Sequence, residues 1–410
     1  MMLWDWLKSK HSEYYAEHQT ATVFVEAMTV IGILFIISMA VTNGRTLAST
    51  LVYVQADTFM DYFNSVVFGL SDPYSNPRVI YPPLITAIYM VIAKYTNDFV
   101  FIYGNDYSID MRNSEVPMMV FIIITLLTIV LLQSVIEKNL KDGGCGKFSN
   151  IMFFTILLSY PVLWTLERGN SLMYTVPAVM LFITGYNSNN IFIRVASYVA
   201  IGFAAGIKIS PAFFTLLILS QRRYMEFLAC IGIMALMVLA PFAYTGGSIE
   251  VFMNHGLSYN DSVIPIVNFR NVGELLGLSG NAIFVLSGVF ILLTAALCIW
   301  SGLEEWEKIL LISCVCIEFF ALNTPYLTLY LLSALIPFLV CNRSLNRKSI
   351  IYLVFFVIEF AMIPTPFETY GTLAFAKFLC IFAAMMMLFG YGIYKLLRRS
   401  DGEGMACGVE

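Results

Sequence analysis

The sequence predicts an all-α integral membrane protein, a single domain folded as a bundle of about 12 transmembrane helices. Two observations predict this class. Of the 410 residues, 59% are hydrophobic, and the mean hydropathy is +0.79. Only 12% of the residues are charged, which is about half the share found in soluble domains. Lipid is therefore the expected solvent for most of the surface.

Apolar runs follow one another along the chain. A spanning helix needs roughly 20 mostly apolar residues, and the number of such runs lies in the range of roughly 11 to 13. A further apolar run, 82–96, begins at Pro82 and Pro83, and we expect it to re-enter the membrane or lie at its surface. The candidate spans are residues 22–42, 116–136, 149–165, 171–186, 191–207, 211–221, 227–245, 281–300, 309–322, 326–341, 350–364 and 372–394.

Basic residues in short loops predict the orientation, because cytoplasmic loops are enriched in Lys and Arg. They place both termini in the cytoplasm and the two large polar segments, 43–115 and 246–280, outside. The number of crossings places every basic loop on the cytoplasmic side only if the run 82–96 does not cross the membrane. Juxtamembrane helices are therefore expected within the first external segment. The Gly-containing tail 400–410 is expected to be a disordered cytoplasmic extension. The basic loops carry Lys138, Lys141, Lys147, Arg222, Arg223, Arg343, Arg347, Lys348, Lys395, Arg398 and Arg399.

The composition also argues against several functions. The net charge is −4 and basic residues cluster only near 395–399, so nucleic acid is not an expected partner. Three His without metal-binding spacing and eight Cys placed mainly in apolar runs predict neither a metal site nor a disulfide framework. No phosphate-binding loop motif occurs in a usable context. We therefore expect no cofactor and no nucleotide-driven chemistry.

Asp57 and Asp61 are the first candidates for catalysis. They follow the first apolar run, and four residues apart they share one face of a helix. Two neighbouring carboxylates raise the pKa of one of them, which suits a general base. The alternative interpretation is a pair of solvated acids at the start of an interfacial helix.

Arg168 and Lys208 are candidates for phosphate binding. Both are expected at external helix ends, and ionisable groups in or near the bilayer are costly enough to suggest function. Arg and Lys are the usual phosphate-binding side chains. The alternative interpretation pairs Arg168 with Glu167 and lets the Lys208 side chain extend to the membrane surface.

The external loop 254–274 contains His255, Asn268 and Arg270, a mixture that suits sugar hydroxyls and phosphate, although an ordinary polar loop explains it equally well. Three acids fall inside apolar runs, and for these we expect structural pairing or a place in the lining of a cavity. They are Glu26, Glu318 and Glu359.

Four stretches resemble motifs of the membrane-embedded C-type glycosyltransferases, and most closely glycosyltransferase family 87, the polyprenol-phosphate-mannose-dependent type. They are Asp57 with Gly69 and Asp72-Pro-Tyr74, then Tyr81-Pro-Pro-Leu84, then Arg168-Gly-Asn170 with Gly206-Ile-Lys208-Ile-Ser-Pro211, and more weakly Asn268-Phe-Arg-Asn271.

This resemblance implies an inverting transferase of the cell (cytoplasmic) membrane whose active site faces outward. A sugar, mannose or another hexose or pentose, would pass from a polyprenyl-phosphate donor to a lipid or polysaccharide acceptor among the membrane lipids. Asp57 or Asp61 would be the base, and the choice stays open. The resemblance implies a phosphate site drawn from Lys208, Arg168, Arg270 and Arg78, and substrate contacts from Tyr74, Tyr81, Asn170, His255 and Asn268, without a metal.

Two other functions fit a chain of many helices. A transporter or flippase of a lipid-linked or small polar solute would use Lys208, Arg168 and the intramembrane acids as its pathway. Transporters often contain internal repeats with broken helices in matching positions, and this sequence has none. A scaffold without catalysis would leave the charged residues unexplained. The two large polar segments on one side favour the enzyme.

Overall fold

The computed structural model describes residues 12, 15–51, 57–96, 111–258, 268–319, 324–364 and 370–406. Every regular element within these ranges is helical, which confirms the predicted all-α class. The elements are α2 (Gln19–Val41), α3 (Arg45–Thr50), α4 (Met60–Phe68), η2 (Pro73–Ser75), α5 (Pro83–Lys94), α8 (Glu115–Asp142), η3 (Gly146–Phe148), α9 (Ser149–Leu157), α10 (Tyr160–Arg168), α11 (Leu172–Gly185), α12 (Ile191–Ile207), η4 (Ser210–Thr215), α13 (Leu216–Ser220), α14 (Tyr224–Leu239), α15 (Phe242–Thr245), α16 (Ile249–Ser258), α17 (Phe269–Leu275), α18 (Gly280–Trp300), α19 (Glu305–Glu318), α20 (Thr324–Leu327), η5 (Thr328–Leu331), α21 (Leu332–Cys341), α22 (Arg347–Phe360) and α23 (Tyr370–Ala406).

Five helical segments in the described part of the chain are long and apolar enough to cross a membrane, so the protein is a multi-pass membrane protein. Counting α9 and α10 as one span bent by 51° raises this number to 6. Other apolar helices, such as α11, α12 and α21, are shorter. The five long segments are Gln19–Val41, Glu115–Asp142, Tyr224–Thr245, Gly280–Trp300 and Leu373–Arg398.

The predicted total of about 12 crossings therefore exceeds the number of helices that are long enough on their own. Hydropathy cannot separate the two kinds of helix, because a helix buried inside the bundle is as apolar as one that faces lipid. Helix α19 illustrates this, since all of its residues from Ile309 to Glu318 are buried. The total number of crossings therefore stays a prediction. The run 82–96 forms the 12-residue helix α5, which is too short to span a membrane alone.

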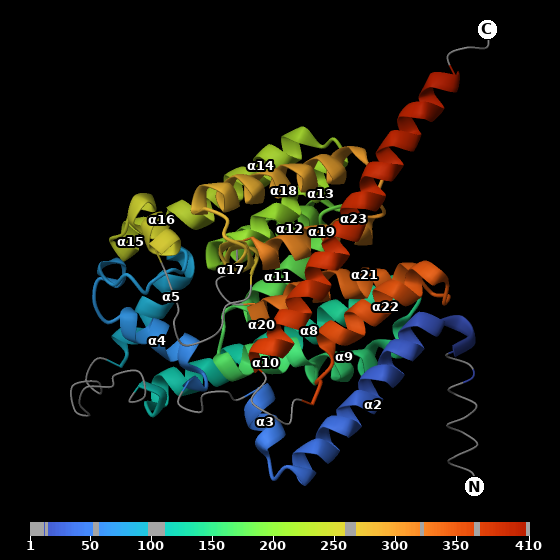
Figure 1. Ribbon diagram of the computed structural model, residues 1–410. Helices are drawn as coiled ribbons and strands as arrows, with labels where there is room; N and C mark the ends of the chain where they lie inside the picture. The colour runs from blue at the N-terminus through green and yellow to red at the C-terminus, as the bar shows by residue number, and fades with distance from the viewer. Residues whose placement is uncertain are drawn as a thin grey trace.

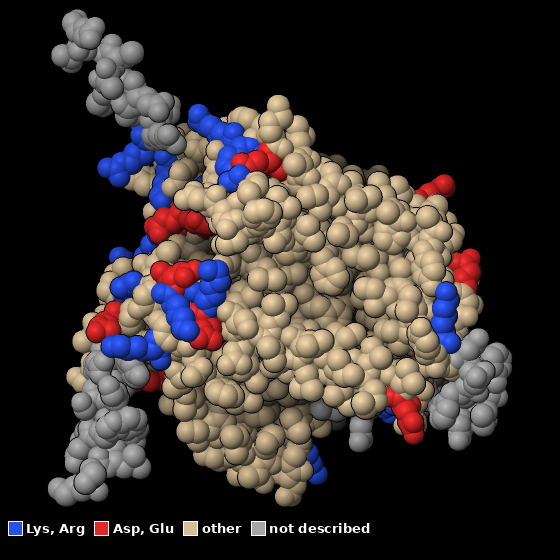
Figure 2. Space-filling model, turned by 180° about the vertical axis from the view of Figure 1, so that it is seen from behind, with Lys and Arg blue, Asp and Glu red and all other residues tan. Residues whose placement is uncertain are grey.

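The bundle has a buried centre and a lipid-like exterior. The centre is formed by α19 and α21 with α11 packed nearby, whereas α2, α8, α14 and α18 lie around it (Figure 1). These outer helices expose large apolar side chains, for example Val30, Leu127, Leu236 and Leu292. Figure 2 shows the result on one face, where charged side chains gather toward the margins and the broad middle is uncharged.

Two glycines of the sequence motifs hold α5 in place. Gly69 follows α4, and a Cβ there would lie 2.9 Å from Met90 Cα. Gly206 lies near the end of α12, and a Cβ there would lie 2.6 Å from Leu84 Cδ2. Figure 1 shows α4 and α5 together at one end of the bundle, beside α15 and α16. Because neither position has room for a side chain, α5 is fixed between α4 and α12.

The C-terminal helix differs from its prediction. Helix α23 continues to Ala406, into the segment 400–410 for which disorder was expected. A helix that is already nucleated extends at low cost, and Gly402 and Gly404 each weaken it by only about 1 kcal/mol. The Gly residues of the tail therefore do not end the helix where the sequence suggested. Residues 407–410 lie outside the described part of the chain.

Candidate active site

Two short loops meet to form the candidate site. One contains Phe59, at the start of α4, and the other contains Gly169, at the end of α10. The Phe59 amide donates to the Glu167 carbonyl over 2.6 Å. Both Phe59 and Gly169 have a φ of 64°, and a Cβ at residue 169 would lie 2.9 Å from the Phe59 carbonyl oxygen. Glycine is thus required at residue 169 for both its conformation and its closeness to the neighbouring loop.

Arg168 joins the two predicted carboxylates. Its Nη1 lies 3.1 Å from Asp57 Oδ2, and its Nη2 lies 3.0 Å from Asp61 Oδ1. Only 11% of the Arg168 side chain is exposed. A single guanidinium therefore fixes both acids, which is the planar, two-pronged recognition that Arg performs and Lys does not.

The two carboxylates differ in how many of their oxygens are engaged. Asp61 also accepts a hydrogen bond from Asn170 Nδ2 over 2.6 Å, so both of its oxygens have partners. Asp57 Oδ1 has no hydrogen-bond partner among the described residues. The Asp57 side chain is 30% exposed and that of Asp61 is 15% exposed. Within the described ranges, Asp57 thus has one oxygen without a hydrogen-bond partner and is the more exposed of the two acids.

Lys208 lies beside this cluster at the C-terminal end of α12. Its Nζ is 4.7 Å from the centre of the Tyr81 ring and 5.9 Å from that of Tyr326. Within the described ranges, no carboxylate forms an ion pair with it. Burial lowers the pKa of Lys208 to about 8, although the nearby Asp61 acts in the opposite direction.

Three residues at the site were missed or given no catalytic role by the sequence analysis: Thr58, Arg112 and Glu167. The Thr58 hydroxyl donates to Glu167 Oε1 over 2.9 Å, and Arg112 Nη1 donates to the Thr58 carbonyl over 3.1 Å. These contacts hold the backbone between Asp57 and Phe59 against the end of α10. The position of Glu167 beside Arg168 offered a signal for it, whereas nothing in the sequence around Arg112 linked it to Thr58.

Other predicted residues hold the first external segment together. Tyr74 donates through its hydroxyl to the Tyr81 carbonyl over 2.9 Å, and Asp72 accepts from the Tyr74 amide. His255 Nδ1 lies 3.1 Å from the Val79 carbonyl, which ties α16 to this segment. Tyr74 and His255 therefore position the loop that carries Tyr81.

The remaining candidates lie apart from the carboxylates. Arg270 pairs with Glu274 over 3.0 Å on the exposed side of α17, and Arg78 lies exposed after η2. No contact between described residues joins either of them to Asp57, Asp61 or Arg168. Asn268 is buried just before α17. The structure thus brings together Asp57, Asp61, Arg168 and Asn170, with Lys208 and Tyr81 adjacent.

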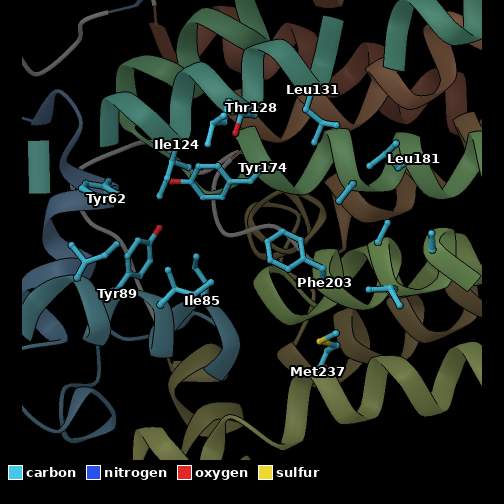
Figure 3. Close-up of a pocket in the computed structure, with 17 residues that line it drawn as sticks. Tyr62, Ile85, Tyr89, Ile124, Thr128, Leu131, Tyr174, Leu181, Phe203 and Met237 are labelled. Carbon is cyan, nitrogen blue, oxygen red and sulfur yellow. The ribbon is translucent and has the colours of Figure 1, made fainter. Parts of the chain in front are cut away.

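An apolar groove of about 560 Å³ lies among the helices, and Figure 3 shows its lining. One of the lining residues is Tyr62, which directly follows Asp61 in α4. The lining comes from α4, α5, α8, α11, α12 and α14, and it is almost entirely carbon. Tyr62, Tyr89 and Tyr174 lie together in Figure 3, away from Leu181 and Met237. The lining residues are Tyr62, Ile85, Ile88, Tyr89, Ile92, Ile124, Leu127, Thr128, Leu131, Tyr174, Ala178, Leu181, Ala196, Val199, Ala200, Phe203 and Met237.

The fold and these residues define a multi-pass membrane protein in which a cluster of carboxylates and cations lies beside a hydrocarbon-lined groove. Comparison with known families gives the particular group. The family model of glycosyltransferase family 87 matches residues 79–325, more than half of the chain. The chain therefore belongs to this family and is a membrane glycosyltransferase. No curated protein and no solved structure matches the sequence.

The matched range covers only part of the site. It contains Arg168, Asn170 and Lys208, whereas Asp57 and Asp61 precede it. The two carboxylates are connected to the matched region through Arg168 and Asn170.

Proposed function

We propose that the protein is an inverting transferase that moves a sugar from a polyprenyl-phosphate donor to a lipid or glycan acceptor outside the cytoplasmic membrane. The observation that carries this proposal is the position of a carboxylate with a free oxygen, and of a lysine without a carboxylate partner among the described residues, beside an apolar groove. A donor with a charged phosphate and a hydrocarbon chain needs a cation for the phosphate and an apolar groove for the chain, next to each other.

Asp57 is the better candidate for the base. Its free oxygen can accept the proton of an acceptor hydroxyl, whereas both oxygens of Asp61 already accept hydrogen bonds. In the reaction, the acceptor hydroxyl gives its proton to Asp57, and its oxygen attacks the anomeric carbon from the side opposite the phosphate. The bond from that carbon to the phosphate oxygen breaks, and the electron pair leaves with polyprenyl phosphate. Attack from the opposite side inverts the anomeric configuration.

Lys208 is the better candidate for binding the donor phosphate. Arg168 already binds two carboxylates, so its main role here is to orient Asp57 and Asp61. The Lys208 ammonium lies against aromatic rings and has no such partner within the described ranges. A cation in this position would stabilise the charge that grows on the departing phosphate. Arg270 and Arg78 are the second choice, because they are exposed and Arg270 is paired.

The groove supports a lipid-linked donor. It is lined by aliphatic and aromatic side chains, which suits a hydrocarbon chain and not a nucleotide. Lys208 follows Phe203, one of its lining residues, at the end of the same helix. A chain in the groove would thus bring its phosphate toward Lys208.

One experiment separates this function from transport. Purified protein is incubated with a set of polyprenyl-phosphate sugars and an acceptor glycolipid, and the release of polyprenyl phosphate is measured. We expect release from one sugar donor, with inversion at the anomeric carbon. A protein that moves the intact donor across a vesicle membrane without breaking it would be the transporter or flippase instead.

A second experiment tests the orientation and the proposed total of about 12 crossings. An Asn76→Cys variant should react with an impermeant thiol reagent added outside cells, and an Asp142→Cys variant should not. Both positions are exposed or half-buried, so reagent access is not limited by the fold. Labelling of the Asp142→Cys variant from outside would contradict the proposed placement of the site outside the cytoplasm.

A further inference from the structure

The groove contains hydroxyl groups in an otherwise apolar setting. Tyr62, Tyr89 and Tyr174 contribute phenolic hydroxyls from α4, α5 and α11, and Thr128 contributes an aliphatic one from α8. The Tyr62 hydroxyl donates to the Pro117 carbonyl over 3.1 Å and is therefore satisfied. The phenols of Tyr89 and Tyr174 belong to a groove whose lining contains no charged or amide side chain among the described residues. The hydrogen-bond partners of these two hydroxyls therefore need to be identified.

Tyr89 and Tyr174 are hydrogen-bond partners of each other. Figure 3 shows their hydroxyls pointing toward one another, and the two side chains interact through a hydrogen bond. In the described part of the chain, neither hydroxyl makes a hydrogen bond to any third group. Two hydroxyls have two hydrogens, and one bond between them uses one. One donor therefore remains unused on a pair in which the Tyr89 side chain is only 3% exposed.

The position of this pair relates it to the charged residues. Tyr174 is close enough to Asp61 to interact electrostatically. The Tyr89 ring lies 6.5 Å from the Tyr81 ring, which also contacts the Lys208 ammonium. The two hydroxyls thus lie between the hydrocarbon lining of the groove and the cluster of Asp57, Asp61 and Lys208.

We propose that Tyr89 and Tyr174 form a clasp for the head of a lipid phosphate, in which the unused hydroxyl hydrogen is donated to a phosphate oxygen next to the lipid chain. This inference rests on the proposed function and adds a specificity element to it. The unused hydrogen faces a groove whose lining is almost entirely carbon, and a phosphate oxygen supplies the acceptor that this lining lacks. A lipid alcohol offers a much weaker acceptor, because hydrogen bonds to charged groups are the stronger ones. The clasp therefore selects lipids that end in phosphate.

Tyrosine-to-phenylalanine substitutions test the clasp, because they remove only the hydroxyl. Binding of farnesyl phosphate and of farnesol is measured for the wild type, for Tyr89→Phe, for Tyr174→Phe and for the double variant. We expect the double variant to bind farnesyl phosphate about tenfold more weakly, the loss expected for one hydrogen bond to a charged group. Farnesol binding should not change. In the transfer assay, the KM for the donor should rise and the KM for the acceptor should stay constant.

Tyr62→Phe is the matched control. It removes a hydroxyl from the same groove, but one that already bonds to a backbone carbonyl, so the preference for farnesyl phosphate over farnesol should be retained. Each single variant still carries one unused hydroxyl hydrogen, so only the double variant removes the donor, and thermal unfolding shows whether this variant folds. Equal binding of farnesyl phosphate by the wild type and by the double variant would overturn the clasp, as would equal affinity of the wild type for farnesyl phosphate and farnesol. An equal loss for farnesyl phosphate and farnesol would overturn it too, since only the shape of the groove would then have changed.

The failure of the clasp and the failure of the proposed function give different results. A wild type that transfers sugar from a lipid phosphate while the Phe variants match it in every parameter retains the function and loses the clasp. A wild type that prefers farnesyl phosphate in a hydroxyl-dependent way but transfers no sugar retains the clasp and loses the transferase mechanism.

Discussion

Two of the groups of ionisable side chains in the described part of this largely apolar protein differ in their surroundings. In the first group, Asp57 and Asp61 have a guanidinium partner and remain partly open. In the second, Glu318 and Glu359 are 1% and 0% exposed, and their carboxyl oxygens have no hydrogen-bond partner in the described structure. Lys377 lies near Glu359 but donates to the carbonyls of residues 358 and 359.

This difference shows which acids can take part in a reaction. A carboxylate held on one side and open on the other can meet a substrate in a fixed geometry, whereas one that is enclosed on all sides cannot. An acid within an apolar run is therefore not by itself a sign of catalysis. A catalytic acid needs both a partner that orients it and exposure on its other side. Among these four acids, Asp57 combines the two most clearly, since it contacts Arg168 and is 30% exposed.

The largest expected effect is that of Asp57→Asn. The amide keeps the shape of the side chain but cannot take the acceptor's proton, so the transfer rate should fall by about 10²- to 10⁴-fold. Donor binding should change little, because Lys208 and the groove are untouched. Both are measured in the transfer assay and by binding of the lipid donor.

Asp61→Asn is the comparison for this variant. It weakens the contact with Arg168 and should lower the free energy of unfolding by about 1.5–3 kcal/mol, the usual loss for a hydrogen bond to a charged group. The rate should fall less than in Asp57→Asn. If Asp61→Asn alone abolishes transfer while Asp57→Asn remains fully active, the base is Asp61. If both variants remain active, neither carboxylate is the base.

Lys208→Met should have the second largest effect. The methionine keeps the apolar stem but removes the ammonium, which should weaken donor binding by about 1.5–3 kcal/mol, or roughly 10- to 150-fold in the KM for the donor. The fold should be retained, since no carboxylate among the described residues loses an ion-pair partner. A variant that unfolds while its remaining folded fraction binds donor normally would show that Lys208 has a structural role and that the phosphate is held elsewhere.

The pH dependence of donor binding follows from the same lysine. Burial lowers the pKa of Lys208 to about 8, so the ammonium is present below this value and is lost as the pH rises through it. The KM for the donor should therefore increase above pH 8, whereas Lys208→Arg should lack this increase because Arg stays charged. An identical alkaline profile in Lys208→Arg would assign the titration to another group.

The smallest effect is expected in the second group. Glu359→Gln replaces an enclosed carboxyl that has no hydrogen-bond partner in the described part of the chain, so the transfer rate should stay within about twofold of the wild type. Stability, measured by thermal unfolding, should not fall. A large loss of activity in this variant would remove the distinction between the two groups and give the intramembrane acids a functional role.

Parts of this architecture were predictable from the sequence, and parts were not. Composition alone predicts an all-helical membrane protein, and the motif residues Asp57, Arg168, Asn170 and Lys208 do meet in space. The pairing of Arg168 with both carboxylates was not predictable, because it depends on the contact between the loops at residues 59 and 167, far apart along the chain. Arg112 was missed for the same reason. The number of crossings stays a prediction, because a buried helix and a spanning helix have equal hydropathy.

Helix α12 has a consequence for the proposed lipid-phosphate donor. It carries the groove wall at Ala196, Val199, Ala200 and Phe203, and Lys208 follows its last residue as the C-cap. Phe203 and Lys208 are five positions apart, which at the rise of an α-helix sets an axial spacing of about 7.5 Å. In the proposed function, α12 would therefore set the distance between the site of the hydrocarbon chain and the site of the phosphate. One residue inserted between Phe203 and Lys208 would turn the lysine by about 100° around the axis, so the distance and the direction are encoded together.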